Sequence, residues 1–210
     1  MITKRDIEII ETIKEFRILS SGQIQRMFNM TQPKVSKRLD IITNNIKEIK
    51  KKRYDPTDNF YNSTYKQILK NENVYYWNRK PTAIVHDLLV NEVYLYLKDR
   101  FNLIHFTKEY PITMDNEFVV RADANIVFEY NGAEYEFLLE LENNKGFNYF
   151  KYNKLFEMDW IPIPIVVVTD RRVYNNNKNI EIIRSRLNLE GLENNIKKWI
   201  IYNEFGYKIN

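Results

Sequence analysis

The chain has 210 residues and a mass of 25.5 kDa, enough for one large domain or two small ones. It has no cysteine and two histidines, which excludes disulfides, thiol nucleophiles and zinc fingers and disfavours a Ser-His-Asp triad. No apolar run reaches ~18 residues and the N-terminus lacks the apolar core of a signal peptide. We therefore expect a cytoplasmic protein with no membrane segment.

The net charge of +4 conceals two unlike parts. Residues 1–80 hold 17 Lys and Arg against 9 Asp and Glu, whereas residues 81–210 hold 15 against 19. A basic part joined to an acidic part predicts two domains with different tasks, one of them facing a polyanion. We expect a linker at Lys80-Pro81, with the first domain over residues 1–80 and the second over residues 81–210.

Two helices are predicted at the start of the basic domain. The first covers residues 3–16, with Thr3 as its cap and Asp6 in its first turn, where a carboxylate favours the helix N-terminus. Its apolar face recurs at helical spacing and consists of Ile7, Ile9, Ile10, Ile13 and Phe16. Ser20-Ser21-Gly22 then interrupts the chain, and either serine can cap a short second helix.

A third helix is predicted after the tight connector at residues 29–31. Thr31 caps it, Pro33 lies in its first turn, and Val35, Leu39 and Ile42 share one face. Three short helices with a three-residue turn before the third follow the helix-turn-helix plan. The exposed face is expected to reach base edges in a DNA major groove, and it carries Gln32, Lys34, Lys37 and Arg38.

A basic strand follows this helix. Residues 46–54 favour a strand and include four consecutive basic residues, Lys50, Lys51, Lys52 and Arg53. Residues 55–59 favour a turn, and residues 65–77 can return as one or two strands. A hairpin after three helices predicts a winged helix with the basic run on its wing. A solvated strand end is the alternative reading, but the position of the run after a recognition helix favours phosphate contacts with double-stranded DNA.

The acidic domain is predicted as an α/β fold, a mixed α+β sheet with the element order αβββαβ and a final helix and strand. The expected elements are a helix over 82–100, strands over 101–110, 122–130 and 133–142, a helix over 148–160, a strand over 161–169, a helix over 179–194 and a strand over 199–205.

The hairpin register follows from the turn at Asn131-Gly132, the strongest two-residue hairpin signal. Pairing Tyr130 with Ala133 puts Asp123 directly opposite Glu140, and Arg121 opposite Glu142 as a cross-strand ion pair. Two carboxylates facing each other destabilise a hairpin unless something compensates. Three explanations stay open: a divalent cation such as Mg²⁺, a lysine from the following segment, or hydration on an exposed face. The lysines within reach are Lys145, Lys151 and Lys154.

An αβββαβ order with Asp in the second strand and Glu-Leu-Glu in the third resembles the PD-(D/E)xK nuclease superfamily, whose fold is the restriction-endonuclease-like core. In that superfamily an Asp and a Glu hold Mg²⁺, and a Lys two residues after the Glu helps to activate water. The resemblance places Asp123 and Glu140 at the metal-binding carboxylates and Glu142 at the position of the lysine. It implies Lys154 as the substitute lysine. Glu92 matches an auxiliary acid, or is a partly buried polar residue.

The whole chain is also similar to the replication-relaxation family of plasmids and other mobile elements. The resemblance rests on the winged helix at 1–80, on His86–Tyr94, on Asp123, on Leu139–Glu142 and on Lys154-Leu155. It implies a DNA-binding protein of a plasmid, phage or other mobile element, with replication or conjugation proteins as partners.

Three functions remain open at this point. The first is sequence-specific binding of double-stranded DNA in replication, transfer or transcriptional control, by two copies on a palindromic site. The second is a Mg²⁺-dependent DNA endonuclease that uses Asp123 and Glu140. The third is a protein-interaction module with an aromatic surface. The missing motif lysine favours the first, with a catalytically degenerate second domain.

Overall fold

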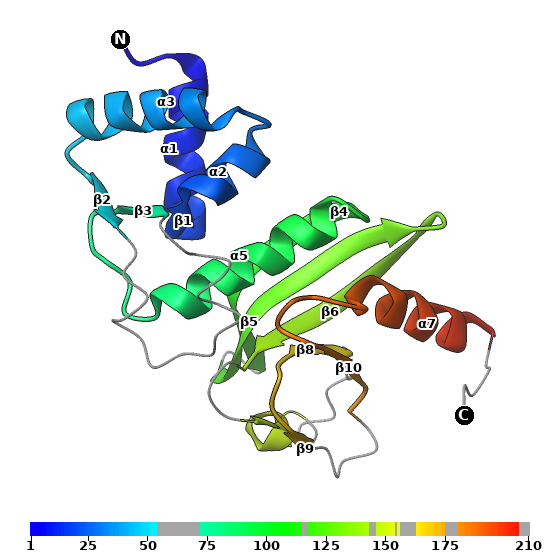
Figure 1. The fold of residues 1–210 in the computed structure, drawn as a ribbon. Helices are drawn as coiled ribbons and strands as arrows, with labels where there is room; N and C mark the ends of the chain where they lie inside the picture. The colour runs from blue at the N-terminus through cyan, green and yellow to red at the C-terminus, as the bar shows by residue number, and fades with distance from the viewer. Residues whose placement is uncertain are drawn as a thin grey trace. The chain divides into compact units, whose positions relative to one another are not determined.

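The computed structural model describes residues 1–53, 72–114, 117–142, 146–153, 155, 163–174 and 180–205. The chain is a mixed α/β protein that divides into two compact units, Met1–Leu95 and Tyr96–Asn210 (Figure 1). The predicted linker at Lys80-Pro81 lies inside the first unit. Within the ranges above, no helix has the length and the apolar run that a membrane crossing needs.

The first unit combines helices with a small antiparallel sheet. Its elements are α1 (Lys4–Phe16), β1 (Ile18–Ser20), α2 (Ser21–Met27), α3 (Gln32–Asn45), β2 (Ile49–Arg53), β3 (Asn73–Trp77) and most of α5 (Ile84–Lys98). In the part of this unit that is described, the sheet order is β1-β3-β2. The three predicted helices and the strand after the third are confirmed, whereas β1 was not predicted.

Local sequence explains where these helices begin. Thr3 caps α1 in a capping box with Asp6, as predicted, and Ser20 forms a second capping box with Gln23 at the start of α2. Pro33 lies in the first turn of α3, where its missing N–H costs nothing. The segment 54–71, with the predicted turn and part of the return strand, lies outside the described residues.

One core holds the first unit together. It joins α1, α2, α3 and the sheet through fully buried side chains that include Ile9, Ile13, Ile24, Val35, Leu39 and Ile42. Burial of such side chains is the main stabilising contribution to a unit of this size. Ile7 was predicted on the apolar face of α1, but its side chain is 52% exposed, because the buried face of α1 runs through Ile9, Ile10, Ile13 and Phe16.

The second unit is built on a mixed sheet. Its elements are β4 (Asn102–Met114), β5 (Glu117–Tyr130), β6 (Ala133–Leu141), β7 (Phe147–Asn148), the 3₁₀ turn η2 (Tyr149–Tyr152), β8 (Ile165–Val168), β9 (Val173–Tyr174), β10 (Ile182–Ser185) and α7 (Leu192–Phe205). Among the described residues the sheet has five strands in the order β10-β8-β6-β5-β4. β4, β5 and β6 are antiparallel, and β6, β8 and β10 are parallel.

The hairpin of β5 and β6 has the predicted register. Tyr130 pairs with Ala133, and the ladder continues to Ala124 opposite Leu139. Asn131 and Gly132 have φ of 53° and 79°, the left-handed conformations that a tight hairpin turn of this twist requires. The predicted strand 161–169 is confirmed in its second half as β8, which is buried on both faces between two parallel neighbours.

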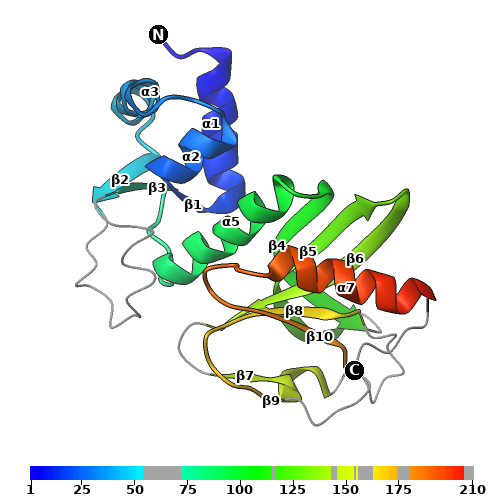
Figure 2. The same cartoon turned by 45° about the vertical axis from the view of Figure 1, so that its right-hand side comes forward.

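Both faces of this sheet are covered. α7 lies across one face (Figure 2). There the Trp199 ring meets Phe137 edge to face, with the ring centroids 5.1 Å apart. On the other face a second core includes Ala122, Leu138, Tyr152 and Leu155. The central strand β6 is therefore buried continuously from Phe137 to Leu141.

Three predictions for the second unit are wrong. Residues 182–185 form a strand instead of a helix, because Ile183, Ser185 and Leu187 alternate with exposed arginines. Residues 199–205, expected as a strand, belong to a helix that covers residues 192–205, since Leu192, Ile196 and Ile200 are buried at helical spacing. The helix expected over 148–160 begins as a short strand and a 3₁₀ turn, and residues 154 and 156–160 lie outside the described residues.

Candidate functional site

Helix α3 presents a polar and basic surface in the first unit. Val35, Leu39 and Ile42 are fully buried on one side, which turns Gln32, Lys34 and Lys37 to the exposed side of the helix. In the part of the chain that is described, no carboxylate pairs with Lys34 or Lys37. These side chains are therefore available to a ligand with negative charge or hydrogen-bonding edges.

Arg38 differs from its prediction, because it does not lie on this exposed face. Its guanidinium binds the buried carboxylate of Asp6 on α1, with Nε 2.7 Å from Oδ1 and Nη2 hydrogen-bonded to Oδ2. Burial raises the pKa of Asp6, but hydrogen bonds from Arg38 and Thr3 outweigh it and lower the pKa from 3.8 to about 2. Arg38 thus holds α3 against α1 and positions the exposed face instead of contributing to it.

The basic strand β2 lies beside β3 and is tied to α3. Lys51 Nζ lies 3.1 Å from Asp40 Oδ1 of α3, and this hydrogen bond raises the pKa of Lys51. Lys50 and Arg53 are exposed, and Lys52 is half-buried. Of the four predicted basic residues of the wing, Lys51 is therefore partly neutralised by a neighbour within the chain. Lys50 and Arg53 are the most accessible.

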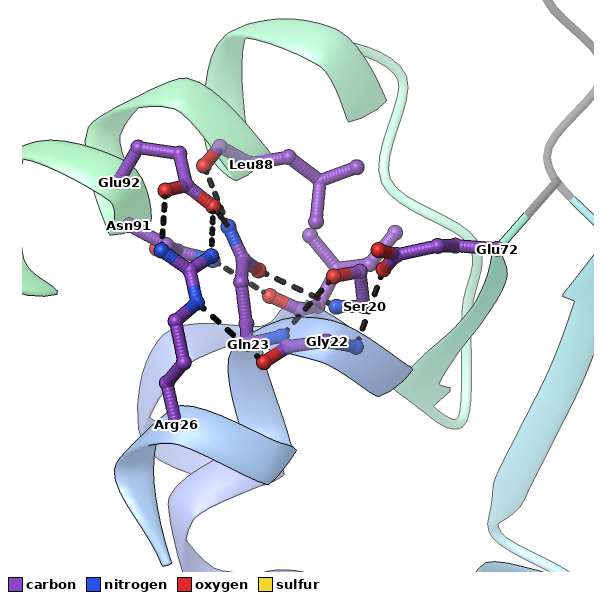
Figure 3. Close-up of polar contacts among 9 residues, drawn as sticks. Ser20, Gly22, Gln23, Arg26, Glu72, Leu88, Asn91 and Glu92 are labelled. Atoms are coloured by element: carbon purple, nitrogen blue, oxygen red, sulfur yellow. Dashed lines mark hydrogen bonds and ion pairs between the residues drawn. The ribbon is translucent and has the colours of Figure 1, made fainter. Parts of the chain in front are cut away.

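A buried polar network holds α2 against α5 (Figure 3). The Gln23 side chain, fully buried, accepts 3.1 Å from the Ser20 N–H and donates 2.8 Å to the Leu88 carbonyl and 2.9 Å to Glu92 Oε1. Arg26 binds the same Glu92 carboxylate through both terminal nitrogens, at 2.8 and 2.5 Å. A bidentate pair of this kind fixes the relative orientation of the two side chains in addition to pairing their charges.

A second contact joins α5 to the sheet of the first unit. Asn91 is fully buried in α5, and its Nδ2 donates 2.7 Å to the carbonyl of Ile18 in β1. The Tyr94 ring packs on Phe16 with centroids 4.7 Å apart. These contacts explain why the first unit extends to Leu95, beyond the predicted linker.

Glu92 is a structural residue in this arrangement. Its side chain is 13% exposed, and its carboxylate is occupied by Arg26 and Gln23. The reading of Glu92 as a partly buried polar residue is confirmed. The reading as an auxiliary catalytic acid has no support from these contacts.

The second unit contains a buried carboxylate at the end of β6. Glu140 is 1% exposed; Lys151 Nζ lies 2.5 Å from its Oε2, and the Tyr152 hydroxyl donates to its Oε1. Burial raises the pKa of Glu140 from 4.5 to about 7, with the nearby Asp123 charge adding to the effect and Lys151 opposing it. Burial and Glu140 together raise the pKa of Tyr152, which stays a hydrogen-bond donor.

The predicted carboxylate pair is close together, but the ladder ends one pair before it. Asp123 Oδ2 accepts 2.7 Å from the backbone N–H of Leu141. Hydration of both carboxylates on an exposed face is wrong for Glu140, which is buried. Of the explanations left open by the sequence, a lysine is the one that these contacts support, and it is Lys151. Arg121 Nη1 lies 3.9 Å from Glu109 Oε2 of the neighbouring strand β4, whereas its predicted partner Glu142 follows β6, the neighbour on the other side of β5.

These residues do not fit Mg²⁺ as they are arranged. Both oxygens of Glu140 are taken by Lys151 and Tyr152, and one oxygen of Asp123 accepts a backbone hydrogen bond. Mg²⁺ needs octahedral oxygen ligands, and the ammonium of Lys151 stands where the cation would bind. Among the described residues no three His, Cys, Asp or Glu side chains converge in a way that could hold a metal. Lys154 lies outside the described residues.

Sequence reasoning did not find several residues that build these sites. Gln23 and Asn91 are polar residues within otherwise apolar helix faces. Such interruptions indicate buried polar groups with partners. Tyr152 carried no comparable signal.

Comparison with models of protein families gives no match, and comparison with curated proteins gives none either.

Proposed function

We propose that this protein binds double-stranded DNA through a winged helix-turn-helix in its first unit, with α3 as the recognition helix. The observation that carries the proposal is the exposed surface of α3, which carries Gln32, Lys34 and Lys37. The basic strand β2 follows this helix and is tied to it through Lys51 and Asp40. The order of α1, β1, α2, α3, β2 and β3, with β3 central in the sheet, supports it.

The charge of the first unit favours a polyanionic ligand, and the exposed helix beside the charge favours DNA as that ligand. Residues 31–53 contain eight basic and two acidic residues, so the positive excess of the chain lies in α3, β2 and the segment between them. A helix with amide and ammonium groups reads base edges, while lysines and arginines on a neighbouring strand contact phosphates. Gln32 would carry base readout, and Lys50 and Arg53 would carry phosphate contacts.

The second unit, for which the sequence predicts a restriction-endonuclease-like core, serves in this proposal as a non-catalytic partner or dimerisation module. The Lys151–Glu140–Tyr152 cluster supports a non-catalytic role, because it satisfies the buried carboxylate without metal. The resemblance to replication-relaxation proteins places this activity in the replication, transfer or transcriptional control of a plasmid, phage or other mobile element. Two copies on a palindromic site are part of the proposal.

Fluorescence anisotropy with labelled duplex DNA tests the proposal. We expect Lys34→Ala/Lys37→Ala to weaken binding at least about tenfold, since each lost phosphate or base contact costs about 1 kcal/mol or more. Gln32→Ala should reduce the preference among duplex sequences more than the affinity for random duplex.

A charge-matched variant provides the control. Lys98→Ala/Lys198→Ala removes two exposed lysines of α5 and α7 and should leave duplex binding unchanged. Equal losses in the two double variants would mean that binding follows net charge and not the face of α3, and would overturn the assignment.

A further inference from the structure

Four arginines gather at one edge of the second unit. Arg171 and Arg172 follow β8, and Arg184 and Arg186 lie in and just after β10. β8 and β10 are parallel neighbours, so the residues at their carboxyl ends meet at the same edge of the sheet. The Nη2 atom of Arg184 donates 3.0 Å to the carbonyl of Arg171 and joins the two pairs.

This grouping is unexpected in an acidic part of the chain. The second unit has six arginines, and these are four of them. All four are exposed, and within the described residues none forms an ion pair. Asp170, which accepts the Leu187 N–H, is the acidic residue next to them in sequence. Exposed guanidinium groups without carboxylate partners favour an anionic ligand.

A cavity of about 520 Å³ lies at this group. It is lined by Arg184, Arg186, Ser185, Glu190 and Asn195. Asn195 Nδ2 donates 2.8 Å to the Arg184 carbonyl and fixes the backbone between the two arginines. Both arginines line this cavity, and a guanidinium group can bind a phosphate through two parallel hydrogen bonds.

Two exposed aromatic rings lie in the segments next to this edge of the sheet. Tyr174 in β9 is 54% exposed and follows Arg172 by two residues; Phe150 in η2 is 61% exposed. β9 pairs with β7, with Tyr174 opposite Asn148, and η2, which carries Phe150, directly follows β7 (Figures 1 and 2). A Cβ at Gly146 would lie 2.4 Å from the Arg172 carbonyl, so glycine allows this close approach.

We propose that this arginine–aromatic surface, formed by Arg171, Arg172, Arg184, Arg186, Phe150 and Tyr174, binds single-stranded DNA. Arginines contact the phosphates and the two rings stack on unpaired bases, the combination that single-strand binders use. Duplex DNA would leave the rings without a role, because its bases are already stacked on each other. The inference rests on the proposed DNA-binding function and adds a second, separate DNA site to it.

Anisotropy with a labelled oligothymidine of about 20 nucleotides, longer than typical single-strand sites, tests the proposal on the full chain. Arg184→Ala/Arg186→Ala should weaken binding at least about tenfold. It should also lower the slope of log K against log salt by about 1.4, for two phosphate contacts on a single strand. Tyr174→Ala should weaken binding about 5- to 100-fold with an unchanged slope, because stacking carries no charge.

Matched variants separate the two proposals. Lys98→Ala/Lys198→Ala should bind oligothymidine as the wild type does, and Lys34→Ala/Lys37→Ala should keep oligothymidine binding while it loses duplex binding. Arg184→Lys/Arg186→Lys, which keeps the charges, should retain the salt slope, and thermal melting checks that each variant is folded.

Wild-type oligothymidine binding by the arginine variant would overturn the inference and leave the duplex proposal standing. Loss of duplex but not oligothymidine binding in that variant would also overturn it, since the ligand would then be duplex. Unchanged duplex binding by Lys34→Ala/Lys37→Ala would instead contradict the proposed function, whatever the arginines do.

Discussion

Replacement of Glu140 by Gln should remove a loss of stability that the wild-type second unit undergoes as the pH rises from 5 to 8. The carboxyl has a pKa of about 7 in the folded chain against 4.5 for the ordinary group, so its contribution is fully present below pH 4.5 and is lost as the pH rises through 7. From these values the wild type should lose about 2.5 kcal/mol relative to Glu140→Gln between pH 5 and pH 8. The substitution also alters hydrogen bonds of Glu140, but it does so at both pH values. The change in the stability difference between pH 5 and pH 8 therefore reports the titration of Glu140 alone.

Urea unfolding followed by ¹⁹F NMR of fluorotryptophan-labelled protein measures this difference. Trp199 of α7 contacts Phe137 of β6 and reports on the second unit separately from Trp77 of the first. Glu134→Gln, which removes an exposed carboxylate of the same strand, is the control and should show no such pH dependence. A stability difference between wild type and Glu140→Gln that is the same at pH 5 and pH 8 would refute the reasoning.

The other structural predictions concern the two buried networks. Lys151→Met should cost about 3 kcal/mol at pH 8, where the ionised Glu140 loses its cation, and much less at pH 5, as urea unfolding at both pH values would show. Mn²⁺ at millimolar concentration should not broaden the NMR signals of β6, because Lys151 holds the cation position; selective broadening there would contradict this. Asn91→Leu should destabilise the first unit by about 1–3 kcal/mol, since the Ile18 carbonyl stays buried without its donor; a neutral result in urea unfolding would count against it. Asp6→Asn should cost about 2 kcal/mol at pH 7, and the loss should shrink below pH 4, because the lowered pKa makes this stabilisation disappear as the pH falls towards 2. A loss at pH 3 as large as the loss at pH 7 in these unfolding measurements would show that charge is not the cause.

Local signals predicted the first unit well because its elements are short and obey local rules. The cap at Thr3, the proline in the first turn of α3 and the spacing of Val35, Leu39 and Ile42 depend only on neighbours in sequence. The role of Arg38 depends on Asp6, which is 32 residues away. Its position next to the buried Leu39 therefore gave no sign that it would turn towards α1.

The end of the second unit was mispredicted because two periodic patterns compete there. Ile182 and Ile183 resemble a helix start, yet the alternation that continues through Ser185 and Leu187 is that of an edge strand. The apolar run at residues 199–202 resembles a strand, but Ile196 and Leu192, which share the buried face of Ile200, lie one and two helical turns before it. Sheet order decides such cases, and sheet order depends on contacts between segments far apart in the chain.

The site in the second unit was predicted in part. The hairpin turn at Asn131-Gly132 was enough to bring Asp123 near Glu140. The sequence did not identify the group that compensates the two carboxylates. Lys151 fills this role, and it lies on a 3₁₀ turn where the sequence predicted a longer helix. A side chain one turn away from the expected position changes which lysine meets the carboxylate.

The salt dependence of duplex binding by Lys50→Ala/Arg53→Ala tests the central claim most directly. If β2 contacts DNA phosphates beside the recognition helix, the slope of log K against log salt should fall by about 1.8, at about 0.9 for each contact on B-form DNA. Lys98→Ala/Lys198→Ala should keep the wild-type slope. An unchanged slope in the β2 variant, with duplex binding intact, would contradict the account of the first unit as a winged helix that holds DNA through α3 and β2.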